Sequence, residues 1–112
     1  MTINNPRIGI LIVAYNAVTT LAKVLNRIPT DVMKEVEEIV VFDDASHDDT
    51  YILAHGYKLL KKLSKLRIFK NPKNLGYGGN QKMGYNYFIN KGIDVVVLLH
   101  GDGQYAPELL KN

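Results

Sequence analysis

The sequence predicts an α/β fold of the Rossmann-like, three-layer α/β/α kind, built on a mainly parallel four-stranded sheet. Strand-sized apolar runs alternate with segments of helical periodicity in the order β-α-β-α-β-α-β, which is typical of such sheets. The strands are apolar throughout, as expected where helices cover both faces. A length of 112 residues suits one domain, so residues 1–112 are expected to form a single unit.

The first half of the chain predicts two strands and one helix. Residues 7–15 form a continuous apolar run rich in Ile and Val, which indicates a strand buried on both faces. The apolar residues of 17–28 recur at helical spacing, and Pro29 is expected to end that helix. Residues 38–42 are predicted to form the second buried strand.

The second half continues the alternation. The expected elements are a helix capped within 46–49, a strand over 66–69, a helix over about 80–91, a strand over 93–99 and a helix from Pro107. Serine and aspartate are favoured caps for the first of these helices. A glycine-rich turn at 74–79 leads into the second, and Gly92 suits its C-terminal end.

Composition narrows the class of protein. Hydrophobic residues make up 46% and charged residues 22%, which excludes a disordered or collagen-like chain. The absence of cysteine excludes disulfides, thiolate nucleophiles and cysteine metal sites. No apolar run reaches the ~18 residues of a membrane-spanning helix, and residues 1–7 carry no signal-peptide pattern, so a cytoplasmic location is expected.

Charge is unevenly distributed, although the net charge is only +3. No Asp or Glu lies between Thr50 and Ile93, where the basic residues are Lys58, Lys61, Lys62, Lys65, Arg67, Lys70, Lys73, Lys82 and Lys91. A solvated helix face followed by a basic turn is one interpretation, and a surface facing anionic lipid or a phosphorylated partner is another. Nucleic acid is not expected, because aromatic residues are not interleaved with the lysines.

Polar and glycine residues concentrate after the predicted strands, at residues 14–16, 43–49, 71–79 and 100–104. The carboxyl ends of parallel strands share one edge of the sheet, and ligands bind beyond that edge. These segments are therefore the candidate binding site. Tyr15 ends the first strand there, so its ring can flank or stack on a nucleobase. Tyr77, Tyr85 and Tyr87 are expected to be packing residues instead.

Two adjacent carboxylates, Asp43 and Asp44, follow the second strand directly. Like charges repel in a partly desolvated site, so such a pair is costly unless a ligand uses it. A carboxylate here can accept hydrogen bonds from a nucleobase N–H or a ribose hydroxyl. A turn with a helix cap explains one of Ser46, Asp48 and Asp49, but it explains the adjacent pair less well.

The glycine-rich segment contains Asn74, Gly76 and Gly79 and precedes a helix. It is either a tight turn that needs glycine for positive φ, or a place where the backbone approaches a ligand and helix N–H groups meet phosphate. A dinucleotide fingerprint is excluded, because glycine would be needed at Gln81. A P-loop is excluded, because no G-K-[ST] occurs.

The segment after the fourth strand offers oxygen and nitrogen ligands. Asp102, Gln104 and His100 can present them to one metal ion, and Mg²⁺ or Mn²⁺ is the expected cofactor. The alternative is a glycine-rich turn in which Asp102 caps the following helix. His47 and His55 have no partner at metal-ligand spacing and are expected to be surface or helix residues.

Taken together, the four segments resemble the family 2 glycosyltransferases, whose glycosyltransferase A fold contains a nucleotide-sugar-binding sheet. The matching motifs are Ala14-Tyr15-Asn16; Asp43-Asp44-Ala45-Ser46 with Asp48 and Thr50; Asn74, Gly76, Gly79 and Gly84; and Asp102-Gly103-Gln104 with Pro107 and Glu108. The last motif is similar to that of the dolichol-phosphate mannose synthase-like branch. The chain departs from the pattern at Ala14 (usually proline), Ala17 (usually glutamate), Asn80 (usually alanine) and His100 (usually the first aspartate).

The resemblance implies roles for individual residues. The nucleotide-binding residues are expected to be Ala14, Tyr15, Asn16, Asp43, Asp44, Asn74, Gly76 and Gly79, with the second aspartate of the pair on the base. Asp102 takes the place of the second metal-binding aspartate, Gln104 that of the glutamine ligand and His100 that of the first aspartate. The catalytic base of this family is a carboxylate of a later segment, which would lie beyond Asn112. Glu108 is expected to complement a helix dipole instead.

The implied activity is that of a hexosyltransferase in envelope or glycan biosynthesis. It would use a UDP- or GDP-linked sugar and a divalent ion, with polyprenyl phosphate or a glycan as acceptor, at the cytoplasmic membrane face. The chain is expected to be the donor-binding part, truncated before the acceptor half and inactive alone. A non-catalytic nucleotide-binding or protein-interaction module of the same fold stays open, because His100 departs from the metal motif.

Two other enzyme or signalling classes fit the sequence less well. A phospho-receiver domain also alternates strands and helices, but its acidic pair follows the first strand. A sugar nucleotidyltransferase would carry a glycine-rich, arginine-containing loop after the first strand, where this chain has Ala14-Tyr15-Asn16. Both are therefore disfavoured by the position of the motifs along the chain.

Overall fold

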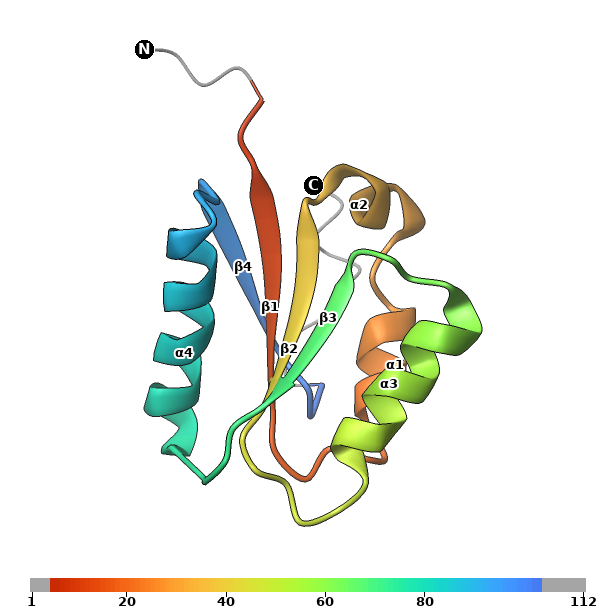
Figure 1. Cartoon of the computed structure of the whole chain (residues 1–112). Helices are drawn as coiled ribbons and strands as arrows, with labels where there is room; N and C mark the ends of the chain where they lie inside the picture. The colour runs from red at the N-terminus through yellow and green to blue at the C-terminus, as the bar shows by residue number, and fades with distance from the viewer. Residues whose placement is uncertain (1–4, 104–112) are drawn as a thin grey trace.

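A four-stranded parallel sheet forms the centre of the molecule, as the sequence predicts. The computed structural model describes residues 5–103. Its strands are β1 (Ile8–Ala14), β2 (Glu38–Asp43), β3 (Leu66–Lys70) and β4 (Val95–His100). They lie in the order β3-β2-β1-β4, and every neighbouring pair is parallel (Figure 1). All four strands therefore end at the same edge of the sheet.

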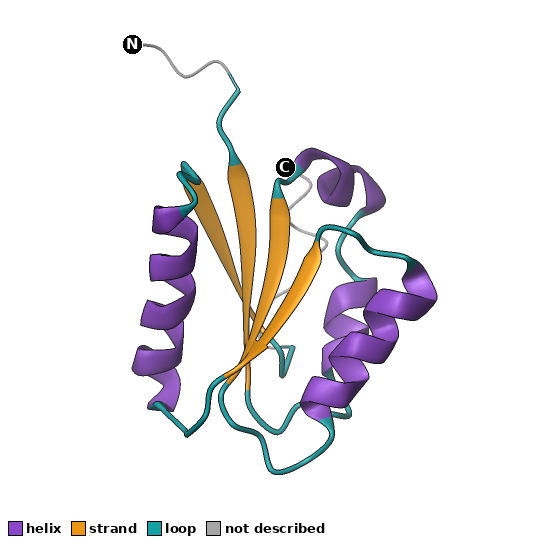
Figure 2. Cartoon of the chain, viewed as in Figure 1, coloured by secondary structure: helices purple, strands orange, loops and turns teal. Residues whose placement is uncertain are grey.

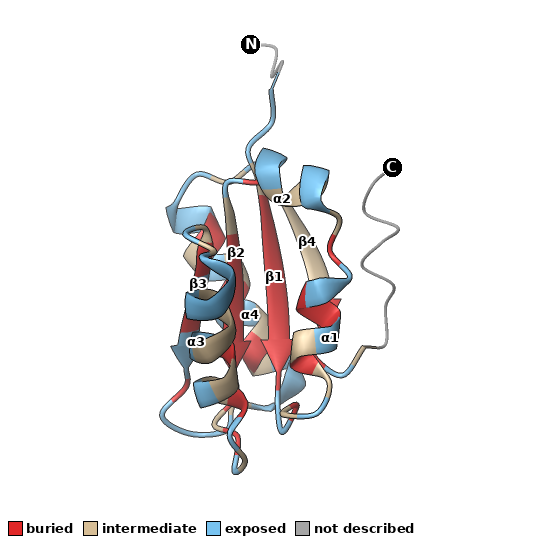
Figure 3. Ribbon diagram, turned by 90° about the vertical axis from the view of Figure 1, so that its right-hand side faces the viewer, coloured by how far each residue is buried: buried red, intermediate tan, exposed pale blue. Residues whose placement is uncertain are grey.

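Helices cover both faces of the sheet and complete the three layers (Figure 2). They are α1 (Leu21–Asn26), α2 (Thr30–Glu35), α3 (Thr50–Lys61) and α4 (Gly76–Asn90). α1 and α3 lie on one face and α4 on the other. Side chains alternate along β1, so Ile10 and Ile12 pack on the α1 and α3 side, whereas Leu11 and Val13 pack with Phe88 of α4. Burial of both faces explains why β1 is apolar throughout (Figure 3).

The helix boundaries differ from the sequence predictions at three points. α1 begins at Leu21 rather than at residue 17, because the preceding turn is tied to α3 by the Ala17 N–H, which donates to the Thr50 hydroxyl (2.8 Å). α1 ends at Asn26, two residues earlier than predicted, and α2 follows Pro29 at once, since proline tolerates the position just before a helix. α4 begins at Gly76 rather than near residue 80, so the glycine-rich turn is partly its first turn.

The end of the described chain also bears on the predictions. Gly92 follows α4 with φ of +72°, as expected for the residue after a helix. β4 begins at Val95, two residues later than predicted. The helix expected from Pro107 lies outside the described residues. Within residues 5–103, none of the helices is both long and apolar enough to cross a bilayer.

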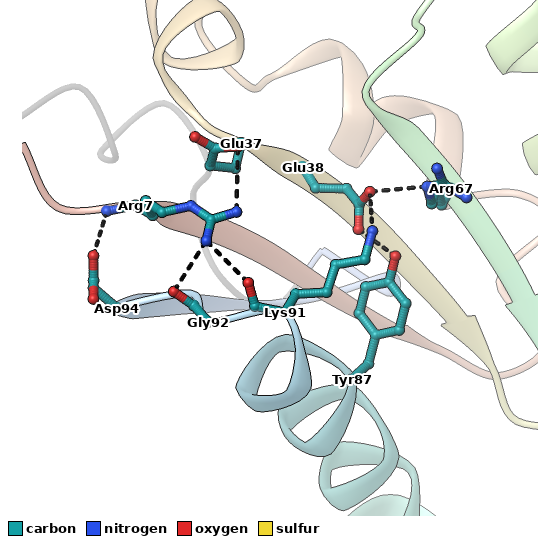
Figure 4. A network of polar contacts seen from close by, with 8 residues as sticks. All are labelled: Arg7, Glu37, Glu38, Arg67, Tyr87, Lys91, Gly92 and Asp94. Atoms are coloured by element: carbon teal, nitrogen blue, oxygen red, sulfur yellow. Dashed lines mark hydrogen bonds and ion pairs between the residues drawn. The ribbon is translucent and has the colours of Figure 1, made fainter.

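A network of charged side chains lies at the amino ends of the strands, opposite the candidate site (Figure 4). Glu38, the first residue of β2, accepts a hydrogen bond from the Tyr87 hydroxyl. It also pairs with Arg67 (2.8 Å) and Lys91 (3.2 Å). Partial burial by itself raises the pKa of Glu38, but these hydrogen bonds and cations outweigh burial and hold the pKa below its usual value.

We expect Glu38→Gln to lower the free energy of unfolding at pH 7 by about 1–2 kcal/mol, because hydrogen bonds to a charged group are lost. The pKa of Glu38 is depressed in the folded state, so its contribution is complete above the ordinary value of 4.5 and is lost as pH falls through the folded value. Urea unfolding at pH 7 and near pH 3 measures both effects. The difference between the two proteins should shrink in acid, and a difference independent of pH would contradict the network.

Candidate functional site

A cavity of about 500 Å³ lies at the carboxyl ends of the strands, a volume within the range of small-molecule sites. Its lining residues are Val13, Ala14, Tyr15, Asp44, Asn74, Gly76, Tyr77, His100 and Asp102. All four segments singled out in the sequence contribute to it. Of the remaining predicted site residues, Asn16, Asp43 and Gly79 do not line the cavity. Gln104 lies outside the described residues.

Asp44 presents a carboxylate to this cavity although the residue is almost fully buried. Its Oδ1 accepts hydrogen bonds from Asn71 Nδ2 (3.0 Å) and from the Leu75 N–H (2.8 Å). Asn74 Nδ2 donates to the Asp44 carbonyl oxygen (3.2 Å). Within residues 5–103 these contacts place no donor on Oδ2. One oxygen is thus held by the protein, and these hydrogen bonds do not engage the other.

Two buried asparagines, which were not among the predicted site residues, hold Asp44 in place. Asn80 Nδ2 donates to the Phe42 carbonyl (2.9 Å), and Asn80 Oδ1 accepts from Asn71 Nδ2 (2.8 Å). The same Asn71 amide reaches Asp44. This chain of hydrogen bonds links α4, the end of β2 and the segment after β3. Asn80 could have been predicted to take part, because it replaces the alanine of the family pattern. A buried amide requires hydrogen-bond partners, so its presence indicates a polar network.

Asp43 occupies a different environment from its neighbour. It is fully buried and does not line the cavity. Its Oδ1 accepts a hydrogen bond from the Ser46 hydroxyl, while Oδ2 has no hydrogen-bond partner among the described residues. Burial raises the pKa of Asp43, and the Ser46 hydrogen bond and the charge of Lys70 only partly oppose this effect. The different surroundings explain how two adjacent carboxyl groups coexist at this strand end.

The loops after β1 and β2 brace each other. Asn16 adopts a left-handed backbone conformation with φ of +49°. Its N–H donates to Ser46 Oγ (2.8 Å), and its Oδ1 accepts from the His47 N–H (2.9 Å). Asp48, one of the three candidate caps, accepts the Thr50 N–H (3.0 Å) at the start of α3. In this structure Asn16 therefore supports the loop that carries the cavity rather than lining it.

Two half-exposed tyrosines line the cavity, Tyr15 at 46% and Tyr77 at 52% exposure. Tyr77, expected to be a packing residue, instead lies half-exposed at the cavity. Because α4 begins at Gly76, Tyr77 lies in its first turn, and the Tyr77 hydroxyl is 2.7 Å from His100 Nε2. Tyr85 and Tyr87 do pack beside the core, as predicted. The cavity thus has one aromatic residue from β1's end and one from α4.

Of the predicted metal ligands among residues 5–103, only Asp102 is both exposed and at the cavity. Asp102 is exposed and lines the cavity, whereas His100 is buried with Nε2 against the Tyr77 hydroxyl. Among residues 5–103 no group of three His, Asp or Glu side chains is placed to hold a metal ion. Mg²⁺ commonly takes one or two protein carboxylates together with substrate phosphates. Asp102 at an open cavity therefore fits the protein's share of such a site.

Solved glycosyltransferase structures have the same fold. Mannosyltransferase PcManGT from Pyrobaculum calidifontis, in complex with GDP-Man and Mn²⁺, matches with a TM-score of 0.76 and 21% identity, over 96% of this chain and 31% of that chain. TarS 1-349 of S. aureus matches with a TM-score of 0.65 and 22% identity, over 94% and 30%. GalNAc-T7 with UDP, GalNAc and Mn²⁺ matches with a TM-score of 0.56 and 20% identity, over 93% and 20%.

These likenesses confirm the expected glycosyltransferase A fold. This chain spans 31% or less of the length of each of these three structures. Among curated proteins no match to the chain is found. A family model, however, matches residues 9–112, a range that contains every residue lining the cavity. That model describes glycosyl transferase family 2, and the chain belongs to this family.

Proposed function

We propose that the chain is the donor-binding part of a hexosyltransferase that uses a nucleotide-diphosphate sugar, UDP- or GDP-linked. The observation that carries this proposal is the Asp44 carboxylate, with one oxygen held by the protein and the other left at the cavity. Uracil and guanine both present ring N–H groups, for which a carboxylate oxygen is a strong acceptor. The GDP-Man and UDP held by solved relatives of the same fold support this class of donor.

The other cavity residues suit the rest of the donor. Tyr15 offers an aromatic ring beside the base. The first turn of α4, which begins at Gly76, offers backbone N–H groups and a helix dipole to the diphosphate. We assign Asp102, together with Gln104 and His100, to the diphosphate and a divalent ion. When bound, Mg²⁺ or Mn²⁺ would neutralise the charge that develops on the leaving nucleoside diphosphate.

The proposed acceptor is a polyprenyl phosphate or a glycan, and the proposed branch is the dolichol-phosphate mannose synthase-like one. The Asp102-Gly103-Gln104 motif with Pro107 and Glu108 supports this branch. The base that would deprotonate a hydroxyl acceptor is proposed to lie beyond Asn112. The 112-residue chain should therefore bind donor without transferring sugar, and robust turnover by this chain would contradict the proposal.

A thermal-shift panel tests the donor. A nucleotide at about ten times its Kd should stabilise the fold by about 1.4 kcal/mol, which is a rise of roughly 5 °C in Tm for a domain of this size. We expect UDP, GDP or one of their sugars to give this rise, enhanced by Mn²⁺, while ADP and Mn²⁺ alone give little. A nucleotide shift that is indifferent to Mn²⁺ would favour the non-catalytic module. No shift with any nucleotide in a folded sample would overturn donor binding.

A further inference from the structure

The outer face of α3 exposes three large apolar side chains, with the exposed His55 between the first and the second of them. Ile52, Leu59 and Leu60 are 68%, 76% and 84% exposed, whereas Ala54 of the same helix is fully buried against the core. At helical spacing, Ile52 and Leu59 stand two turns apart on one side of α3. Large apolar side chains gathered on one exposed face mark a contact surface more often than single scattered ones do.

Lysines surround the C-terminal end of this apolar face. Lys61 ends α3, Lys62 follows it with φ of +55°, and both are exposed. Lys58 and Lys65 lie beside them, and their ammonium groups donate to backbone carbonyls, Lys65 Nζ to that of Lys34 at 2.7 Å. No acidic residue occurs from 50 to 93 to neutralise this charge along the chain. The α3 patch, defined as Ile52, Leu59, Leu60, Lys61 and Lys62, is therefore both apolar and cationic.

α4 provides an internal comparison on the opposite face of the molecule. Its outer side also exposes apolar residues, Met83 at 44% and Ile89 at 67%. The residues around Ile89 include the neutral amides Asn86 and Asn90. Lys91, which follows α4, is already paired with Glu38. Lys82 is exposed beside Met83 on α4, so what distinguishes the α3 patch is the pair of exposed leucines followed directly by the pair Lys61 and Lys62.

We propose that the α3 patch docks the protein on an anionic lipid bilayer. Apolar side chains exposed on a helix enter the headgroup boundary, while flanking lysines extend to anionic headgroups. Protein interfaces, in contrast, are depleted in lysine and enriched in aromatic residues and arginine. The composition and charge of the patch therefore favour a lipid surface over an acidic protein partner.

The position of the patch is compatible with an open donor site. α3 starts after the carboxyl end of β2, near the cavity, and ends before the amino end of β3. Leu59 and Leu60 lie in its last turn, so the most exposed part of the patch is at the end of the molecule remote from the cavity (Figure 1). Docking through this end leaves the cavity accessible from solution, and the proposal does not depend on which donor binds.

Co-sedimentation of the 112-residue chain with vesicles tests the proposal. We expect binding to phosphatidylcholine vesicles that contain about one third phosphatidylglycerol to be at least ~tenfold tighter than to phosphatidylcholine alone, and to weaken as salt rises. The double variant Leu59→Ser, Leu60→Ser and the double variant Lys61→Gln, Lys62→Gln should each weaken binding about tenfold or more. The matched control, Met83→Ser with Ile89→Ser on α4, should stay within about twofold of the parent protein.

Several results would overturn the docking surface. Equal binding to neutral and anionic vesicles, or no binding to either, would do so. A loss of binding in the α4 control as large as in the α3 variants would also contradict it. Tight binding of polyglutamate, unchanged by the leucine substitutions, would indicate an acidic protein partner instead. Circular dichroism and thermal unfolding of each variant verify that it is folded. The nucleotide thermal shift, measured on the same variants, separates the two proposals: it should survive loss of vesicle binding. Vesicle binding without any nucleotide response would reject the donor proposal alone.

Discussion

We expect Asp44→Asn to weaken nucleotide binding about 10- to 100-fold. The amide keeps the shape of the side chain, and its oxygen can still accept from Asn71 Nδ2 and the Leu75 N–H. The second oxygen becomes an NH₂ group, which cannot accept a base N–H, and the negative charge is lost. A hydrogen bond to a charged group contributes about 1.5–3 kcal/mol, which is roughly a 10- to 100-fold change in Kd. Titration calorimetry with UDP and GDP measures this change.

Asp49→Asn is the matched control for the loss of charge. Asp49 is exposed on the same loop, lies outside the cavity lining and makes no side-chain capping hydrogen bond to α3. Its substitution removes the same charge without touching the cavity, so Kd should change by less than about twofold. An equal loss in both variants would mean that Asp44 acts by long-range charge and not by contact.

Asp43→Asn tests whether the two adjacent aspartates contribute differently to nucleotide affinity. Asp43 is one of the proposed nucleotide-binding residues, yet its carboxyl group is buried beside Ser46 and does not line the cavity. The structure therefore predicts a smaller loss of affinity than for Asp44→Asn. A loss as large as that of Asp44→Asn would place Asp43 in recognition after all and would require the loop after β2 to rearrange on binding.

We expect Gly84→Ala to lower the free energy of unfolding by about 1–3 kcal/mol, which is typical of overpacking in a well-packed core. A Cβ atom at Gly84 would lie within 3.0 Å of three side-chain atoms of Leu11. Leu11 is fully buried in β1, so it has little room to move. The clash should outweigh the higher helix propensity of alanine. Urea unfolding followed by circular dichroism measures the change.

Gly78→Ala is the control on the same helix. Gly78 is exposed in the first turn of α4, and a Cβ atom there would meet no atom within 4 Å. Alanine should be neutral at this position or stabilise the protein by up to about 1 kcal/mol. If Gly84→Ala behaves in the same way, α4 does not approach β1 as closely as the structure describes.

Gly84 belongs to a sequence motif but has a structural role that the motif does not indicate. It belongs to the family pattern that follows the third strand, and the pattern as a whole suggests a ligand-binding turn. In the structure Gly76 lines the cavity, whereas Gly84 allows α4 to pack against β1. Residues of one motif therefore serve two purposes, and spacing along the chain does not separate them.

The helix starts show which part of the fold the sequence could not predict. Periodicity located the cores of α1, α3 and α4 but not α2, and α1 and α4 begin where turns are tied to other elements, as the Ala17 N–H is to Thr50. The wrong expectation for Tyr77 has the same cause, namely the position at which α4 begins. A helix that started near residue 80 would have left Tyr77 in a turn, whereas the start at Gly76 brings its hydroxyl to His100.

The sequence by itself determined the alternation of the four strands with α1, α3 and α4, the parallel sheet and the strand edge at which the polar segments meet, but not the additional helix α2. These features follow from periodicity and from polar residues placed at strand ends, which are local properties of the chain. Only the tertiary structure decided that Asp44 and not Asp43 lines the cavity, and that Asn71 and Asn80 hold it there. Those contacts join residues up to 38 positions apart, so the folded packing of β2, β3 and α4 must exist before any of them can form.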